Sequence, residues 1–177
     1  MIYSPREDSF LLEREVRKLA KGKSFLDMGS GSGIQAKAAV KAGAKSVLAA
    51  DISSEAVKSL KSQKIQAVKS NLFSGIKKKK LFDIIAFNPP YLPEEKKEPA
   101  ELKPATTGGG KGDEIILKFL KQAKSHLSKD GIILLILSSL TPKERINRVL
   151  ERQKMKKEIL ASQSFFFEAI ELWIIRK

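Results

Sequence analysis

The amino-acid sequence predicts an α/β fold, in which helices cover both faces of a mostly parallel β-sheet. Three observations favour this fold. Short apolar runs rich in β-branched and aromatic residues alternate with amphipathic stretches of helical period. A glycine-rich turn directly follows the first apolar run. The chain closes with two consecutive strand-like runs, which adds an antiparallel strand to the parallel sheet.

Composition limits the classes of protein to consider. The 177 residues have the length of one domain, so we expect a single domain over residues 1–177. The hydrophobic fraction of 42% is sufficient for a core. The lack of cysteine excludes disulfide scaffolds and thiol catalysis, and a single histidine, His126, leaves no histidine cluster, so we expect no metal site.

The chain is strongly basic, with 34 Lys and Arg against 20 Asp and Glu and a net charge of +14. Such a charge favours an anionic partner, nucleic acid included, or merely keeps the protein in solution. The longest apolar run, Ile132 to Leu137, is far shorter than the roughly 18 residues of a membrane span. The N-terminus lacks the apolar segment of a signal peptide. We therefore expect a cytoplasmic protein without a membrane partner.

In the first half of the chain, helices and short strands alternate. Ser4, Pro5 and Glu7 form a start signature for a helix that ends near Lys21 and Gly22. The strands that follow are expected at residues 24–28, 46–52 and 65–70, and the helices between them at 34–42 and 53–61. Ser53 is the expected cap of the second of these helices.

The second half begins with a strand at residues 81–87, which two prolines must end because proline cannot donate to a β-ladder. Residues 92–111 form a long loop that we expect on the substrate side. A helix is expected at 113–127, with His126 near its end as a capping or surface residue, and a strand preceded by Gly131 at 132–137. A second start signature at Thr141 begins a helix that reaches about Lys157, and a hairpin over 160–176 closes the chain.

The glycine-rich turn indicates a nucleotide-type ligand. Asp27 is followed by Gly29, Gly31 and Gly33, and glycines let a ligand approach the backbone closely. Ile34 stands where the dinucleotide fingerprint requires its third glycine, and no G-K-[ST] follows as in a phosphate loop. The turn therefore predicts a ligand without a pyrophosphate.

Two more polar residues stand at the ends of the next two strands. Asp51 ends the second strand, where an acid accepts hydrogen bonds from ribose hydroxyls in dinucleotide folds. Asn71 follows the third strand, where its side chain could pair with the amino edge of an adenine. Each residue alone is also a common cap or turn residue. Their occurrence with Asp27 at three successive strand ends favours the ligand site.

This pattern resembles the class I S-adenosylmethionine-dependent methyltransferases. The resemblance implies an α/β, Rossmann-like class I methyltransferase fold with a seven-stranded, mostly parallel sheet, a C-terminal antiparallel hairpin and helices on both faces. It implies S-adenosyl-L-methionine as the cofactor, with its methionine part at the three glycines and its amino group at Asp27. By the same resemblance Asp51 binds the ribose and Asn71 the adenine.

Asn88, Pro89, Pro90 and Tyr91 follow the fourth strand, beside the expected cofactor site. Methylation of an amide or an exocyclic amine requires two acceptors for the N–H bonds while the methyl group approaches the nitrogen. The Asn88 side-chain oxygen and a rigidly held proline carbonyl supply them, and Tyr91 offers a face to a planar group. We expect Asn88, Pro89 and Tyr91 to act in catalysis, all four residues to bind substrate, and Asn88 to border the cofactor. The alternative is a turn with a buried tyrosine.

The flanking segments resemble the HemK-type release factor glutamine methyltransferases. Tyr3 to Leu12 is similar to their Y-x-P-x-E-D-S-x-L-L opening, Phe87 to Pro93 matches F-N-P-P-Y-[VL]-P, and Gly108 to Ile115 resembles G-G-x-x-G-x-E-[VI]. The chain has no room for the extra N-terminal domain of the bacterial branch, so it is similar to the short archaeal and eukaryotic branch. Glu7 and Asp8 are as consistent with helix capping as with a ligand role.

The resemblance implies the substrate and a partner. The substrate would be the glutamine of the Gly-Gly-Gln loop in a class I peptide chain release factor, and the product N5-methylglutamine. Enzymes of the short branch usually work with a small zinc-binding activator protein that covers apolar surface at the edge of the third strand. Ile65 to Val68 is the matching segment here.

Two other functions stay open at this point. The net charge of +14 favours an RNA methyltransferase that acts on an exocyclic amine such as N6 of adenine, although the basic residues are scattered and nucleic acid is not required by the glutamine hypothesis. A non-catalytic scaffold that binds S-adenosylmethionine is a third class, against which the intact Asn-Pro-Pro-Tyr sequence argues.

Overall fold

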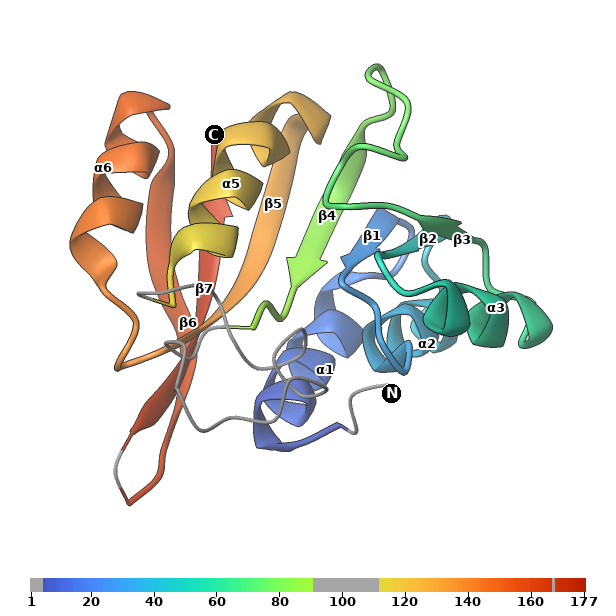
Figure 1. Ribbon diagram of the computed structural model, residues 1–177, viewed down its shortest axis with the longest axis horizontal. Helices are drawn as coiled ribbons and strands as arrows, with labels where there is room; N and C mark the ends of the chain where they lie inside the picture. The colour runs from blue at the N-terminus through green and yellow to red at the C-terminus, as the bar shows by residue number, and fades with distance from the viewer. Residues whose placement is uncertain (1–4, 91–111, 167) are drawn as a thin grey trace.

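The computed structural model describes residues 5–90, 112–166 and 168–177. Within these ranges the chain forms a seven-stranded sheet in the order β3-β2-β1-β4-β5-β7-β6, flanked by helices (Figure 1). The strands are β1 (Ser24–Met28), β2 (Ser46–Asp51), β3 (Ala67–Lys69), β4 (Phe82–Phe87), β5 (Leu127–Ser138), β6 (Lys156–Ser164) and β7 (Ala169–Arg176). The helices are α1 (Glu7–Leu19), α2 (Ile34–Lys41), α3 (Ser54–Ser62), α5 (Glu114–Ala123) and α6 (Lys143–Arg152), with a 3₁₀ turn, η1, at Lys124–His126.

The first five strands are parallel, and β7 is antiparallel to both of its neighbours, β5 and β6. The predicted fold class is therefore confirmed, with the last strand of the chain inserted between β5 and β6. We call the edge where β1 to β5 end the carboxyl edge and the opposite edge the amino edge. In Figure 1 the arrowhead of β4 points down to the carboxyl edge, and the C-terminus lies at the amino edge.

The core lies on both faces of the sheet because successive strand residues point to opposite sides. On one face Phe25, Ile84 and Leu134 pack with α1 and α2. On the other face Leu26, Ile85 and Leu135 pack with α5 and α6. The central strands are thus buried on both sides, as expected for a parallel sheet.

Both predicted start signatures locate a helix but set its first residue too early. Helix α1 begins at Glu7, with Arg6 at the cap position and no side-chain cap. Helix α6 begins at Lys143, with Pro142 at the cap position, and the hydroxyl of Thr141 is buried without a hydrogen-bond partner. In α6 the proline itself occupies the cap position, so Thr141 before it does not cap, whereas Ser4 lies outside the described residues. The predicted Ser53 cap is confirmed, because its hydroxyl accepts a hydrogen bond from the Ala56 amide.

The expected helix over 113–127 is too long, because the chain turns at η1 and β5 begins at Leu127. Leu127 pairs with Phe82, and Gly131 lies inside the strand rather than before it. His126 is buried, not a surface residue. Its Nδ1 lies 3.0 Å from the Lys80 carbonyl oxygen, and its ring stacks on Phe73 with 4.6 Å between centroids.

The helix expected to reach Lys157 ends at Arg152. Lys154 adopts a φ of +54°, which turns the chain, and β6 begins at Lys156. Lys157 pairs with Ile175 of β7, and its Nζ lies 3.4 Å from the ring centroid of Trp173 in a cation–π contact. Within the described ranges no helix has the length and apolar character that a bilayer crossing requires.

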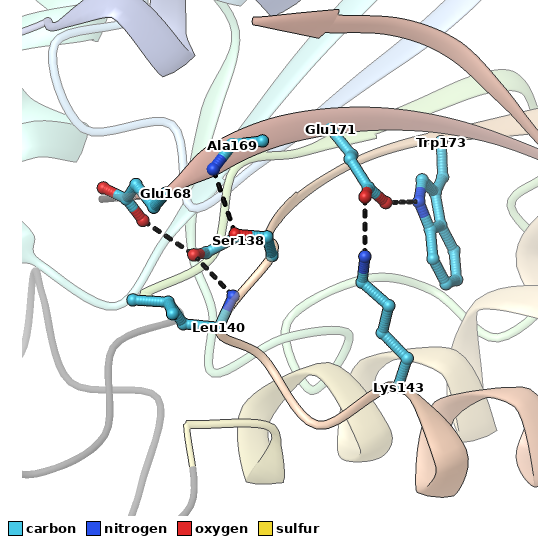
Figure 2. A network of polar contacts seen from close by, with 8 residues as sticks. Ser138, Leu140, Lys143, Glu168, Ala169, Glu171 and Trp173 are labelled. Atoms are coloured by element: carbon cyan, nitrogen blue, oxygen red, sulfur yellow. Dashed lines mark hydrogen bonds and ion pairs between the residues drawn. The ribbon is translucent and has the colours of Figure 1, made fainter. Parts of the chain in front are cut away.

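Two polar contacts tie β7 and the residue before it to the end of β5 and the start of α6 (Figure 2). At the end of β5, Ser138 donates a hydrogen bond of 2.7 Å to Glu168 and accepts one of 3.1 Å from the Leu140 amide. Further along β7, Glu171 accepts a hydrogen bond of 2.6 Å from Lys143 and one of 2.7 Å from the indole of Trp173. These contacts fix the start of α6 against the inserted strand.

Burial alone would raise the pKa of Glu171, but the hydrogen bonds from Lys143 and Trp173 and the nearby lysine charges together lower it. Because its pKa is lowered, Glu171 stabilises the fold at pH values above its ordinary pKa of 4.5. This stabilisation is lost as the pH falls through the folded-state pKa.

We predict that Glu171→Gln lowers the free energy of unfolding by about 2 kcal/mol at neutral pH, because a neutral amide can accept from only one of the two donors well. Urea denaturation at several pH values checks this, and the difference from wild type should shrink at acidic pH. Glu158→Gln is the control, since Glu158 is 72% exposed in its ion pair with Arg176, and it should change stability by under about 0.5 kcal/mol. Equal losses in the two variants would contradict the prediction.

Candidate active site

The carboxyl edge brings together the predicted polar residues from four strands. Asp27 lies in β1 beside Ala86 of β4 and Ala49 of β2, one residue before the strand ends. Asp51 ends β2, and Asn88 follows the last residue of β4. Asn71 lies just after β3, at the outer strand of the sheet, where its side chain is exposed. The strand-end prediction from sequence is therefore realised as one edge.

The glycine-rich turn is built from three residues with positive φ: Gly29 at +63°, Gly31 at +48° and Gly33 at +76°. A Cβ on Gly33 would lie 2.2 Å from a methyl group of Leu60, so any larger residue here would displace this side chain in addition to straining the backbone at a φ of +76°. A Cβ on Gly31 would meet nothing closer than the Gly29 carbonyl oxygen at 4.0 Å. The space in front of Gly31 is thus open to a ligand.

Asp51 holds this turn in place. Its Oδ2 accepts a 2.8 Å hydrogen bond from the Gly31 amide, and its Oδ1 accepts another of 2.8 Å from the Ser53 amide. Each carboxylate oxygen can accept a second hydrogen bond. Asp51 can therefore clamp the backbone and still accept from hydroxyl groups of a ligand.

Asp27 is buried and faces α2, where its Oδ2 accepts a 2.9 Å hydrogen bond from the Ala36 amide. The pKa of Asp27 is raised from 3.8 to about 7, mainly because the carboxyl group is buried; the hydrogen bond from Ala36 opposes this rise, and the charge of Asp51 adds to it. The site thus holds two neighbouring acids, one of which is readily protonated near neutral pH. A cationic ligand would favour the ionised form of Asp27.

Asn88 is held in one orientation by α1. Its Nδ2 donates a 3.1 Å hydrogen bond to Oδ2 of Asp8 and lies 3.4 Å from the Ser9 hydroxyl. Its Oδ1 is buried and has no hydrogen-bond partner among the described residues. A buried acceptor without a partner costs about 1–3 kcal/mol and calls for an explanation, such as a donor that arrives with a ligand.

Pro89 is buried and Pro90 half-buried at the end of β4. Phe87, the last strand residue before Asn88, packs on Phe119 of α5 with 4.5 Å between ring centroids. The start of the expected catalytic segment is therefore anchored in the core. Tyr91 and the expected loop at 92–111 lie outside the described residues.

The contact of Asp8 with Asn88 is the feature that sequence reasoning did not predict, because it left Asp8 between a capping and a ligand role. The distance of 80 residues between the two gives no local signal. Glu7, its neighbour, is exposed in the first turn of α1.

Residues 8–167 match the family model described as methyltransferase small domain. The chain belongs to this family. It is 38% identical over 183 residues to a Methanocaldococcus jannaschii protein provisionally named protein N5-glutamine methyltransferase MJ0928, an alignment that covers 98% of this chain and 90% of the relative. It is 28% identical over 182 residues to the Schizosaccharomyces pombe protein named eRF1 methyltransferase catalytic subunit mtq2, which covers 85% of this chain and 78% of the relative. These relatives confirm the resemblance to the HemK-type enzymes.

Among solved structures, the E. cuniculi Mtq2–Trm112 complex, which is responsible for the methylation of the eRF1 translation termination factor, matches with a TM-score of 0.80. The match covers 99% of this chain and 98% of that chain at 23% identity, and it confirms the fold. The protein is thus an S-adenosylmethionine-dependent methyltransferase with the class I fold. The open space at Gly31 and the two acids at the strand ends fit a cationic nucleoside cofactor.

We predict that the free energy of unfolding of the ligand-free protein depends on pH through Asp27. Because the folded state raises the pKa of Asp27 from 3.8 to about 7, its contribution to stability is fully present below 3.8 and is lost as the pH rises through about 7. Asp27→Asn keeps an acceptor for Ala36 but cannot ionise. The free energy of unfolding of wild type should fall relative to Asp27→Asn by up to about 1.4 kcal/mol per pH unit across this window.

Urea denaturation of the ligand-free proteins across this window checks the difference. Affinity for S-adenosylmethionine, measured by calorimetry, should rise with pH in wild type more steeply than in Asp27→Asn. A stability difference that does not change with pH would contradict the prediction.

Proposed function

We propose that this methyltransferase methylates the side-chain nitrogen of the glutamine in the Gly-Gly-Gln loop of a class I peptide chain release factor. The observation that carries the proposal is the Oδ1 of Asn88, a buried acceptor without a partner at the end of β4. The names of two relatives, an N5-glutamine methyltransferase and an eRF1 methyltransferase, support this substrate class.

The chemistry of an amide nitrogen explains the role of this acceptor. The lone pair of the nitrogen is delocalised into the carbonyl group, so the nitrogen is a weak nucleophile. In our proposal one N–H of the glutamine donates to Asn88 Oδ1 and the other to the Pro89 carbonyl oxygen, and Tyr91 packs on the planar amide. Fixing both N–H bonds orients the nitrogen toward the donor methyl group and compensates the buried acceptor.

The cofactor, when bound, supplies a methyl group on a positively charged sulfur. We propose that Gly29, Gly31 and Gly33 accommodate its methionine part and that Asp27 holds its amino group. Asp51 would accept from its ribose hydroxyls while it keeps the turn closed. Asn71, exposed beyond the end of β3, would contact the adenine, and Asn88 would border the transferable methyl group.

We also propose a small zinc-binding activator protein as a partner at the edge of β3. β3 is an outer strand of the sheet with an unpaired side, which suits the addition of another strand. Ile65 is buried and Val68 half-buried, while Ile52 nearby in sequence is 61% exposed. The E. cuniculi relative was solved as a Mtq2–Trm112 complex, which supports an interface of this kind.

Transfer of labelled methyl groups from S-adenosylmethionine tests the substrate. The release factor and the total RNA of the same organism are offered separately to wild type and to Asn88→Ala. We expect label on the release factor, none on a Gly-Gly-Ala variant of it, and a loss of at least about a hundredfold in rate with Asn88→Ala. Label on RNA alone would contradict the proposal. If neither substrate is labelled, the assay is repeated with the activator, and failure there also contradicts it.

We predict that Asp8 positions Asn88 for this reaction. In Asp8→Ala the Asn88 amide loses its anchor and can present its NH₂ group instead of its oxygen, so kcat should fall about tenfold to a hundredfold. Affinity for S-adenosylmethionine should stay within about threefold, and Asp8→Asn, which keeps an acceptor, should recover most of the rate. Glu7→Ala removes the same charge from the same turn and is the control. A loss of rate in Glu7→Ala equal to that in Asp8→Ala would contradict the role.

A further inference from the structure

The positive charge of the protein is concentrated on the edge of the sheet that faces away from the active site. The described connections at the amino edge are residues 20–23, 42–45, 63–66, 77–81, 124–126 and 153–155 with the C-terminal residue, and they contain 11 lysines and no acidic residue. The described connections at the carboxyl edge contain one arginine and two acidic residues. They are residues 5–6, 29–33, 52–53, 70–74, 88–90, 112–113, 139–142, 165–166 and 168.

The densest part of this charge lies before β4, β5 and β6. Lys77 to Lys80 are all exposed in the turn before β4, Lys129 is exposed near the start of β5, and Lys154 and Lys156 are exposed at the start of β6. We call these residues the amino-edge lysines. Strands lie about 4.8 Å apart, so this group spans roughly 15 Å along the sheet.

Three contacts fix these connections relative to one another. His126 reaches the carbonyl oxygen of Lys80, Lys124 donates to the carbonyl oxygen of Gln153, and Lys177 donates a 2.7 Å hydrogen bond to the carbonyl oxygen of Leu127. The two lysines bind carbonyl groups, which leaves their charge uncompensated. Within the described ranges none of the amino-edge lysines forms an ion pair with a carboxylate.

The surface chemistry separates the classes of anionic partner. A protein interface needs an apolar centre, and stable membrane binding needs apolar insertion in addition to charge. Among the described residues of the amino-edge connections, Leu81 is the one exposed large apolar side chain. A phosphate backbone requires only accessible lysines on a fixed surface.

We propose that the amino edge binds the phosphate backbone of RNA as a docking ligand that is not methylated. The carboxyl edge, where β4 ends before Asn88, lies opposite the amino edge of the same sheet (Figure 1), so the phosphates that contact the amino-edge lysines are bound away from the active site. The charge that made an RNA substrate attractive in the sequence thus has a separate location and a separate role. Binding is measured without methyl transfer, so this proposal stands or fails independently of the glutamine substrate.

Fluorescence anisotropy with a labelled RNA hairpin tests the proposal at several salt concentrations. The test variant is Lys77→Glu/Lys79→Glu/Lys129→Glu. The control is Lys58→Glu/Lys118→Glu/Arg148→Glu, which changes the net charge equally at exposed positions of α3, α5 and α6. We expect the test variant to lose at least about tenfold in affinity and to show a shallower salt dependence than wild type, while the control changes affinity by under about threefold.

The far-ultraviolet circular dichroism spectrum and the urea denaturation midpoint of the test variant should match those of wild type, which shows that the variant is folded. Equal loss of RNA affinity in the control, or no RNA binding by wild type, would overturn the proposal. Methylation of the RNA that depends on Asn88 would overturn it in favour of an RNA substrate. Binding to phosphatidylserine vesicles with an affinity equal to that for RNA would overturn it in favour of a membrane surface.

Discussion

The parallel pairing of β1 with β4 is the constraint on which the site depends. Phe25 and Leu26 of β1 are buried on opposite faces of the sheet, beside Ile84 and Ile85 of β4. A shift of one residue in this register would exchange the two buried faces, so packing on both sides fixes it. The same register places the glycine-rich turn and Asn88 at one edge. The chemistry of the site is thus a consequence of how the core packs, and α1 completes it by bringing Asp8 to Asn88.

Two polar groups of the site lie in energetically unfavourable surroundings, which a bound cofactor and a bound substrate would improve. Asn88 presents a buried oxygen without a donor, and Asp27 is buried near a second acid. Each lowers the stability of the ligand-free fold, and both persist because strong local structure holds them: two prolines and Asp8 for Asn88, and the Ala36 amide for Asp27. A cation next to Asp27 and an N–H donor at Asn88 each remove one of these costs. A substrate that lacks an N–H would leave the Asn88 oxygen unpaired, which is a strong basis for selectivity.

The sequence predicts the strands well because their signal is local: each buried strand is an apolar run followed by a polar or glycine-rich end. The errors fall where tertiary contacts decide. Leu127 has a helical period with Leu120, yet its pairing with Phe82 draws it into β5. Lys157 continues a basic helical pattern, yet its pairing with Ile175 of β7 places it in β6. The strand-end residues of the site were predictable because all parallel strands end at one edge. The anchoring of Asn88 by Asp8 was not, because nothing local relates residues so far apart in sequence.

Net charge is a sum over the chain, whereas a reaction depends on where the charge lies. The value of +14 favours an RNA ligand but says nothing about which surface would hold it. The helices run between the two edges of the sheet. The turns at the amino edge carry the lysines, and the turns that follow the parallel strands at the carboxyl edge carry glycine, asparagine and proline. A lysine near Asn88 would compete for the acceptor that the substrate amide needs, and a positive field there would oppose a sulfonium cofactor. In our proposal, the separation of charge between the edges lets one sheet combine attraction to an anionic surface with a site that must receive a cation.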